Sequence, residues 1–550
     1  MRDMRTERVK AARWFALGPS RERRGMAAAE AAAPAVLGLL LGLLALGPAL
    51  GPGFVLRYDM VFVPDPPLTL PGQGFPRAVP SDLVVALLSR VVPEQVVQKA
   101  ILLGIFVLAA SGAAALVPSG RLGPRLAAAA FYAWNAYLAQ RFLLGQWALL
   151  LGVAGLPWAV RAAALGGRLR LVAALLPAAV GGFQAMLVSA PAVLATAATA
   201  RPRGSAPALG PVSSRVRATG EAALILGGLS LPWLVPALLS GATTDPAGVD
   251  AFAARADGPF GVLGSLLGLG GIWNAHATVP GQGSWWSGGV RLVLAAVAVW
   301  GFVRLRRRDA PPYWTGLAVA AGAGLVIACL GVFAPGLVKA LIVEWPGFGP
   351  IRDGQLHLAP FALLQAVGLA SAVMGPAPAP VAPRPASWIT GAVAVVAPVL
   401  VLPTFALGAF GRLAAVDYPD EWRRVQAIVN ADPAPGALLS LPWGAHRAFR
   451  WNGGRVILDP ATKAFARRVI WNDELLVGLP GGGRIRVAAE DPLVVRAATV
   501  LRGRPEGRAA ALARLGVRYV LEHPGENVFA GGVTVFHGRE LRLVRLDPPS

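Results

Sequence analysis

The stretch AAAPAVLGLLLGLLALGPALGPGFV, residues 31–55, is apolar along its whole length and indicates the class of fold. A helix needs about 20 apolar residues to cross the hydrocarbon core of a bilayer. The stretch follows a basic segment, 1–26, and is longer than the ~7–15 residues of a signal-peptide core. We therefore predict an uncleaved first membrane span and a cytoplasmic N-terminal segment over residues 1–26.

Composition extends this prediction to the whole chain. Of the 550 residues, 55% are hydrophobic and 15% are charged, whereas a soluble domain carries about 25% charged residues. These values exclude a disordered tail protein, a coiled coil and an ordinary cytosolic enzyme. The single cysteine, Cys329, lies in an apolar run, so an intramolecular disulfide and a cysteine-based metal site are also excluded.

Ten further apolar runs predict a polytopic α-helical membrane domain over 27–410, with eleven transmembrane helices. Basic residues flank 170–200 on both sides, so the chain must enter and return if both flanks are cytoplasmic, with the glycine pair 181–182 as turning point. The same reasoning divides 125–161 at the turn 141–146, and a single long helix is the alternative in both cases. The ten runs cover residues 97–117, 125–141, 146–161, 170–184, 186–200, 219–240, 289–305, 313–334, 357–376 and 387–409.

The charge distribution predicts the orientation. The net charge is +22, and most basic residues fall in short loops between the apolar runs. This is the positive-inside pattern of a multi-pass plasma-membrane protein, and it lacks the basic face with interleaved aromatics of a nucleic-acid-binding protein. With the N-terminus inside, eleven spans put the C-terminus outside and predict external loops at 56–96, 242–288 and 335–356.

Residues 411–550 are richer in Pro, Gly and charged residues than the helical part. They predict a small extracytoplasmic α/β or α+β domain, because a segment of this length can bury a core of its own. The expected strands are ALLSLPW (437–443), GRVILD (454–459) and VRYVLEH (517–523), and the expected helices are 420–430 and 505–515.

The first external loop carries the candidate general base in RYDMVFVPDPP, residues 57–67. Asp59 follows the first span directly, beside Arg57, and Asp65 lies a few residues further on. The apolar residues of 81–91 repeat at helical spacing, which predicts a helix lying in the membrane interface. A lipid-linked substrate would meet a general base at this boundary. The alternatives are an ion pair between Asp59 and Arg57 and a turn at Asp65.

A second group of candidate residues lies in VEWPGFGPIRDGQLHLAP, residues 343–360, before the tenth span. The Arg352 guanidinium, together with Lys339, could hold a phosphate, because its fork of N–H donors matches phosphate oxygens. An Arg352–Asp353 pair that caps the helix is the alternative. The five histidines form no HxxxH or HExxH motif, so no metal ligand is assigned. The candidate substrate-binding residues are Arg352, Asp353, Gln355 and His357 at this boundary, together with Lys339 and with Arg57 of the first loop.

Other signals narrow the class of function. The predicted spans contain no mid-span relay of charged residues, which disfavours a proton-driven transporter. GLPGGGRI, residues 478–485, is not a GxxxxGK[ST] sequence, so no Walker-type ATP site is predicted. Trp273 and the pair Trp285-Trp286 could stack on sugar rings, with interface anchoring as the alternative.

This arrangement resembles the C-type (GT-C) integral-membrane glycosyltransferases. The shared features are the internal N-terminus, an acidic residue and an interfacial helix in the first external loop, about eleven spans and a C-terminal extracytoplasmic α/β domain. The Ala-, Gly-, Arg- and Pro-rich composition is similar to that of actinobacterial envelope arabinosyl- and mannosyltransferases. Segments that look like those of actinobacterial membrane proteins are YPDEWRRV (418–425), LPWGAHRAFRWNGGR (441–455) and RDGQ (352–355).

The resemblance implies inverting transfer of a sugar from a polyprenyl-phosphate donor to a glycan or lipid acceptor on the outer membrane face. It implies Asp59 as the general base, with Asp65 as second choice, and Arg352 or Lys339 as contacts of the donor phosphate. Because RYDM and VPDPP hold single acids and no DxD pair, neither a metal nor another cofactor is assigned. The alternatives are a lipid or polysaccharide transporter, with polar residues along a central cavity, and a non-catalytic envelope protein without a cavity around Asp59.

Overall fold

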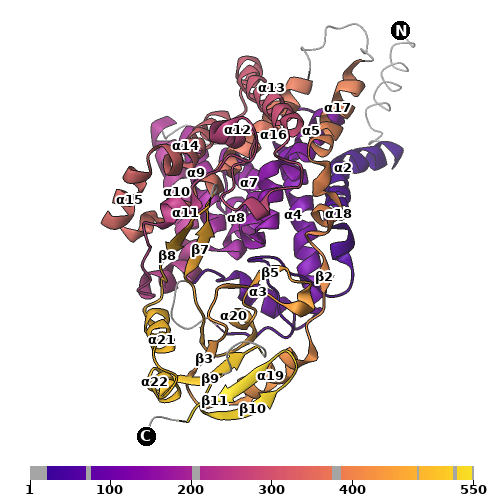
Figure 1. The fold of residues 1–550 in the computed structure, drawn as a ribbon. Coiled ribbons are helices and arrows are strands. Elements are labelled where there is room, and N and C mark those ends of the chain that lie inside the picture. Colours follow the sequence, from indigo (N-terminus) through magenta and orange to yellow (C-terminus); the bar gives the residue numbers. More distant parts are fainter. Residues whose placement is uncertain are drawn as a thin grey trace, which may run out of the picture.

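Helices form one end of the molecule and an α/β domain forms the other (Figure 1). The computed structural model describes residues 21–69, 76–200, 211–374, 386–479, 482–523 and 529–547. Most of the predicted cytoplasmic segment 1–26 lies outside the described residues.

Seven helices in the described part of the chain are long and apolar enough to cross a membrane, so the protein is a multi-pass α-helical membrane protein. An eighth span results if α17 (Ala386–Val401) and α18 (Ala406–Gly411), which form a pair bent by 65°, are counted together. The seven are α2 (Arg21–Leu46, continued by the 3-10 turn Gly47–Leu50), α4 (Glu94–Leu116), α7 (Trp147–Leu165), α10 (Pro211–Leu239), α13 (Trp285–Asp309), α14 (Trp314–Phe333) and α16 (Ala359–Val373, preceded by the 3-10 turn Gly354–Leu358).

The other predicted spans are shorter helices, so the count of eleven is supported only in part. The run 125–141 is two helices, not the one predicted, because Asn135 ends the first and begins the second. Its side-chain amide donates to the carbonyl of Phe131 at 3.0 Å, and its side-chain oxygen accepts from the N–H of Leu138 at 3.0 Å. The shorter helices are α5 (Leu122–Ala133), α6 (Ala136–Leu143), α8 (Arg168–Gly181) and α9 (Phe183–Thr199).

Both predicted divisions of the long apolar stretches are observed, between α6 and α7 and between α8 and α9. Each turn contains a glycine with positive φ, +83° at Gly145 and +74° at Gly182. A Cβ at Gly145 would lie only 2.7 Å from the backbone nitrogen of Asp59. The turn before α7 therefore needs glycine so that the loop after the first span can approach it.

The predicted interfacial helix is α3 (Ser81–Leu88), and its Leu87 and Leu88 are exposed. Ser81 does not cap it: the Ser81 hydroxyl donates to the carbonyl of Ala78 at 3.1 Å, and Pro80 occupies the cap position. The remaining short helices of this part are α11 (Gly248–Phe252), α12 (Gly261–Leu267), α15 (Pro335–Glu344) and the 3-10 turns Ala275–Ala277, Pro346–Arg352 and Pro403–Phe405.

The C-terminal residues form a five-stranded mixed sheet in the order β10-β11-β9-β3-β6. Strand β3 runs parallel to β6 and β9, whereas β11 runs antiparallel to β9 and β10. The three predicted strands and two predicted helices are confirmed as β3, β5, β9, α19 and α22. The sheet strands are β3 (Ala437–Ser440), β6 (Val469–Ile470), β9 (Val517–Glu522), β10 (Val533–His537) and β11 (Arg542–Arg545). The remaining elements are the hairpins β4–β5 (His446–Ala448, Val456–Leu458) and β7–β8 (Leu475–Gly478, Arg484–Val487), the 3-10 turn Arg450–Asn452, and the helices α19 (Asp420–Ala431), α20 (Ala461–Ala464), α21 (Pro492–Arg502) and α22 (Arg508–Arg514).

The two parts are joined by strand pairing and by a shared core. Strand β1 (Phe54–Val55) pairs with β2 (Ala415–Val416), so the end of the first span is bound to the start of the C-terminal domain. Buried residues of α19, including Trp422, belong to the same hydrophobic cluster as Leu46 and Phe106 of the membrane helices. A separate cluster within the domain is built around residues such as Leu439, Val520 and Val544.

Candidate active site

A cavity of about 1810 Å³ is lined by the three predicted external loops, by the C-terminal domain and by residues of α7, α9 and α10. Three of the predicted site residues line it: Asp59 of the first loop, and Arg352 and Asp353 of the third. The other five, Arg57, Asp65, Lys339, Gln355 and His357, are not among the lining residues. Asp59 and Arg352 thus line one cavity.

Backbone hydrogen bonds hold both Asp59 and the residue that precedes it. Its N–H donates to the carbonyl of Leu144, at 3.2 Å, and the preceding residue, Tyr58, donates to the carbonyl of Val456 in β5 at 2.8 Å. The Asp59 side chain is 45% exposed, and its Oδ1 lies 3.2 Å from Nε2 of His446. Its Oδ2 makes no hydrogen bond to any residue that the structure describes.

The predicted ion pair of Asp59 with Arg57 is not formed. The Arg57 guanidinium donates instead to the carbonyls of Leu143, at 2.9 Å, and His276, at 2.7 Å. It also lies over the ring of Tyr58. Arg57 therefore fixes the shape of the first loop and leaves the carboxylate of Asp59 to His446.

Asp65 occupies a turn, the alternative given above. Its φ is +45°, and its N–H donates to the carboxylate of Glu94 at 2.8 Å. Its side chain is 70% exposed and lies 3.7 Å from the guanidinium of Arg90. Asp65 thus contacts the segment that leads into α4.

Ion pairing separates the seven carboxylates that line the cavity into two groups. A carboxylate held by a cation is a weak base, because the charge stabilises its ionised form. Asp59 is paired only with a histidine, and Asp473 has no Lys or Arg within ion-pair distance among the described residues. The other five pairs are Asp82–Lys463, Asp257–Arg291, Asp353–Arg141, Glu490–Arg77 (with Arg352) and Asp491–Arg468.

Two arginines from different loops share one carboxylate at the cavity. Glu490 Oε1 lies 2.9 Å from Nη2 of Arg352, and its Oε2 lies 2.5 Å from Nη2 of Arg77. Burial of Glu490 opposes its ionisation, but Arg77 and then Arg352 together hold its pKa below its usual value. Two guanidinium groups thus meet at this carboxylate, and the carboxyl group of Asp473, which accepts from the N–H of Glu490 at 3.1 Å, lies beside them.

A buried network of ion pairs and hydrogen bonds supports the part of the wall beside Arg352. Arg141, fully buried in α6, binds Asp353 through both Nη atoms, at 2.7 and 2.8 Å, and also contacts Gln355. Gln355 donates to Gln140 at 3.2 Å, and Gln140 donates to Asp257 at 2.8 Å. The Arg352–Asp353 pair, given above as the alternative, is not formed, because Asp353 binds Arg141 and Arg352 binds Glu490.

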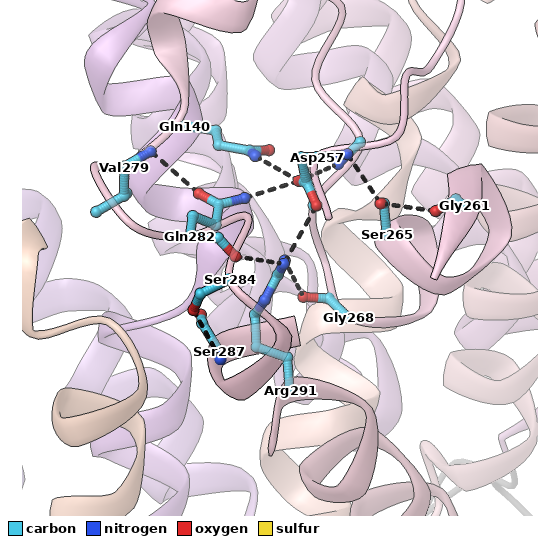
Figure 2. A network of polar contacts seen from close by, with 12 residues as sticks. Gln140, Asp257, Gly261, Ser265, Gly268, Val279, Gln282, Ser284, Ser287 and Arg291 are labelled. Carbon is cyan, nitrogen blue, oxygen red and sulfur yellow. Dashed lines mark hydrogen bonds and ion pairs between the residues drawn. The ribbon is translucent and has the colours of Figure 1, made fainter. Parts of the chain in front are cut away.

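Asp257 lies at the centre of the second half of this network (Figure 2). Its Oδ2 accepts from Gln140, from Gln282 at 2.7 Å and from the N–H of Gly271 at 2.7 Å. Its Oδ1 lies 3.2 Å from Nη2 of Arg291, which is buried in α13. All of these contacts fix the carboxylate, so Asp257 is a structural part of the wall.

Three predicted residues lie outside the cavity lining in other contacts. Lys339 is bound to Asp250 at 2.6 Å, Gln355 belongs to the buried network, and His357 is buried beside it. Among the described residues, no group of three or more His, Cys, Asp or Glu is arranged to hold a metal ion. Sequence reasoning missed Arg77, Asp257, Arg291 and Glu490, whose partners are distant in the chain.

No protein-family model and no curated protein matches this chain. Solved structures do. A single-particle cryo-EM structure of the arabinofuranosyltransferase AftD from mycobacteria superposes with a TM-score of 0.54 at 17% identity, over 94% of this chain and 40% of that one. A mutant form of the same enzyme gives a TM-score of 0.52 at 16% identity, over 94% and 41%. The resemblance to C-type membrane glycosyltransferases is thereby confirmed for the fold, and this chain spans about two fifths of the length of those structures.

Proposed function

We propose that the protein is a membrane glycosyltransferase that moves a sugar from a polyprenyl-phosphate-linked donor to a glycan or lipid acceptor on the outer membrane face. The observation that carries the proposal is the shared cavity of Asp59, Arg77 and Arg352. Of the two cavity acids that no described Lys or Arg neutralises, Asp59 has a side chain that is 45% exposed, whereas the unpaired Oδ1 of Asp473 is buried. The two arginines line the same cavity and supply N–H donors there. The cavity around Asp59 also argues against a non-catalytic envelope protein.

In the proposed reaction, Oδ2 of Asp59 accepts the proton of the acceptor hydroxyl. The acceptor oxygen attacks the anomeric carbon of the donor while the bond from that carbon to the lipid phosphate breaks, so the configuration at the carbon inverts. Arg77 and Arg352 stabilise the negative charge on the departing phosphate through N–H donors. The proton balance closes on Asp59, which becomes a neutral acid.

The walls of the cavity suit a lipid-linked donor. Trp233, Leu234 and Leu238 of α10 and Phe183 of α9 line the part of the cavity next to the membrane helices. Most of α10 is exposed on the surface of the helical bundle, where lipid would cover it. An isoprenoid chain bound along α10 would leave its phosphate near the polar part of the cavity.

The test is transfer of labelled sugar in membranes that contain each variant, with polyprenyl-phosphate-linked arabinofuranose as the first donor because the similar structures are of an arabinofuranosyltransferase. Asp59→Asn should reduce transfer by about 10²–10⁴-fold, the usual effect of losing a general base. Asp65→Asn is the matched control, since this residue does not line the cavity, and it should keep wild-type transfer. Equal transfer by wild type and Asp59→Asn would remove Asp59 from the mechanism, and no transfer by the wild type would contradict the proposed function.

A further inference from the structure

We propose that His446 is a positioning residue for Asp59, and that the C-terminal domain thereby completes the active site. The inference rests on the proposed function. It concerns a residue of the domain that lies far from the first external loop in sequence and meets it at the wall of the cavity.

Backbone pairing sets the register that brings the two side chains together. His446 begins β4, where it pairs with Leu458 of the antiparallel strand β5. On the other edge of β5, Tyr58 donates to the carbonyl of Val456 and accepts from the N–H of Leu458, both at 2.8 Å. Tyr58 therefore acts as a short third strand, and the next residue of the loop, Asp59, lies beside His446.

The contact suits an orienting role. With its proton on Nε2, the imidazole of His446 donates to Oδ1 of Asp59 across 3.2 Å. The Tyr58 ring packs against this imidazole in an edge-to-face arrangement, with 6.0 Å between ring centroids. The hydrogen bond fixes the carboxylate rotamer and leaves Oδ2, which no described residue binds, for the acceptor hydroxyl. A base held in one orientation reacts faster because less freedom is lost in the transition state.

Other contacts at the cavity show that the domain is attached there at several points. Lys463 of α20 binds Asp82 of the interfacial helix at 2.9 Å. Glu490, beyond the β7–β8 hairpin, holds Arg77 and Arg352. The hairpin itself packs against α11 through Val477 and Val487. Together these contacts hold the domain so that His446 keeps its distance from Asp59.

The experiment measures kcat and the KM of the acceptor for three variants of the full chain in membranes. His446→Ala should lower kcat by roughly 10- to 100-fold, the effect of a misplaced reacting group, with acceptor KM within about threefold of wild type. His446→Gln should recover most of this loss, because its amide can donate from nearly the position of Nε2. His537→Ala is the control, since this histidine is exposed on β10 and does not line the cavity.

The double variant Asp59→Asn/His446→Ala separates this inference from the proposed function. It should be no slower than Asp59→Asn alone, because the two residues act as one unit. If His446→Ala keeps the wild-type kcat while Asp59→Asn is inactive, only the role of His446 is overturned. An equal loss in His446→Ala and His446→Gln, with lower melting temperatures for both, would make the residue structural and would also overturn it. Wild-type transfer in Asp59→Asn would remove Asp59 from the mechanism and would overturn this inference with it, whereas the absence of transfer in the wild type would remove the proposed function.

Discussion

Nε2 of His446 lies 3.2 Å from Oδ1 of Asp59, although the two residues are 387 positions apart in the chain. One of them follows the first membrane helix, and the other stands on a hairpin of the C-terminal domain. Between them the pairing of Tyr58 with β5 and of β1 with β2 holds the loop to the domain. Formation of the site therefore depends on folding of both parts against each other.

If the arginines of the site bind the donor phosphate, their loss should weaken binding of the donor selectively. Arg352→Ala removes a charge-assisted hydrogen bond to phosphate, worth ~1.5–3 kcal/mol, so the KM of the donor should rise roughly 10- to 100-fold. Lys339→Ala is the matched control, because Lys339 is paired with Asp250 and does not line the cavity. Donor titrations at saturating acceptor measure both. A larger effect of Lys339→Ala than of Arg352→Ala would contradict this assignment.

Much of the fold could be predicted from local sequence. Apolar runs of sufficient length identified the long helices, and basic flanks correctly divided 125–161 and 170–200. The division of α5 from α6 was missed because a single Asn inside an apolar run carries little signal. Only the structure shows that Asn135 binds both helix ends. The bend between α17 and α18, at the break before Pro403, was also missed.

The candidate site could be predicted only where chain position alone carries the information. Asp59 was found because it follows the first span, and Arg352 because it lies at a predicted membrane boundary. Their partners were not found, since Glu490 is 138 positions from Arg352 and 413 positions from Arg77. Pairs at such separations leave no periodic pattern in one sequence. Arg291 was also missed, because it lies in a run in which apolar residues dominate.

The network around Asp257 predicts a large effect of adding one methyl group. A Cβ at Gly270 would overlap Oδ2 of Asp257 and would lie 2.8 Å from Nη1 of Arg291. Gly270→Ala should therefore break the buried ion pair and destabilise the protein by about 3–5 kcal/mol. Gly104→Ala is the control, because its Cβ would meet nothing within 4 Å. Melting temperatures in detergent compare the two. An unchanged melting temperature for Gly270→Ala would contradict the rigidity of this wall.

Buried His523 predicts a pH dependence of stability in the C-terminal domain. Burial, and then the nearby Arg447, lowers the pKa of His523 to about 4. The unfolded chain binds this proton below about pH 6.5, whereas the folded one does not until about pH 4, so stability falls as the pH drops through this window. The ring packs on Phe449, with 4.9 Å between centroids, so His523→Phe should keep the packing and lose less stability between pH 6.5 and 4.5. Melting temperatures across this range measure the difference, and parallel curves for wild type and variant would contradict it.

The last prediction concerns orientation, for which the basic flanks are the argument. Arg307 is exposed near the end of α13, in the basic cluster expected in the cytoplasm, and the side chain of Arg539 is 91% exposed on the C-terminal domain. Cys329 is the single cysteine of the chain, so Cys329→Ala gives a background in which one new cysteine reports alone. A membrane-impermeant maleimide should label Arg539→Cys in intact protoplasts and Arg307→Cys only after permeabilisation. The reverse pattern would invert the topology, and labelling of both in intact protoplasts would mean an even number of spans between the two positions.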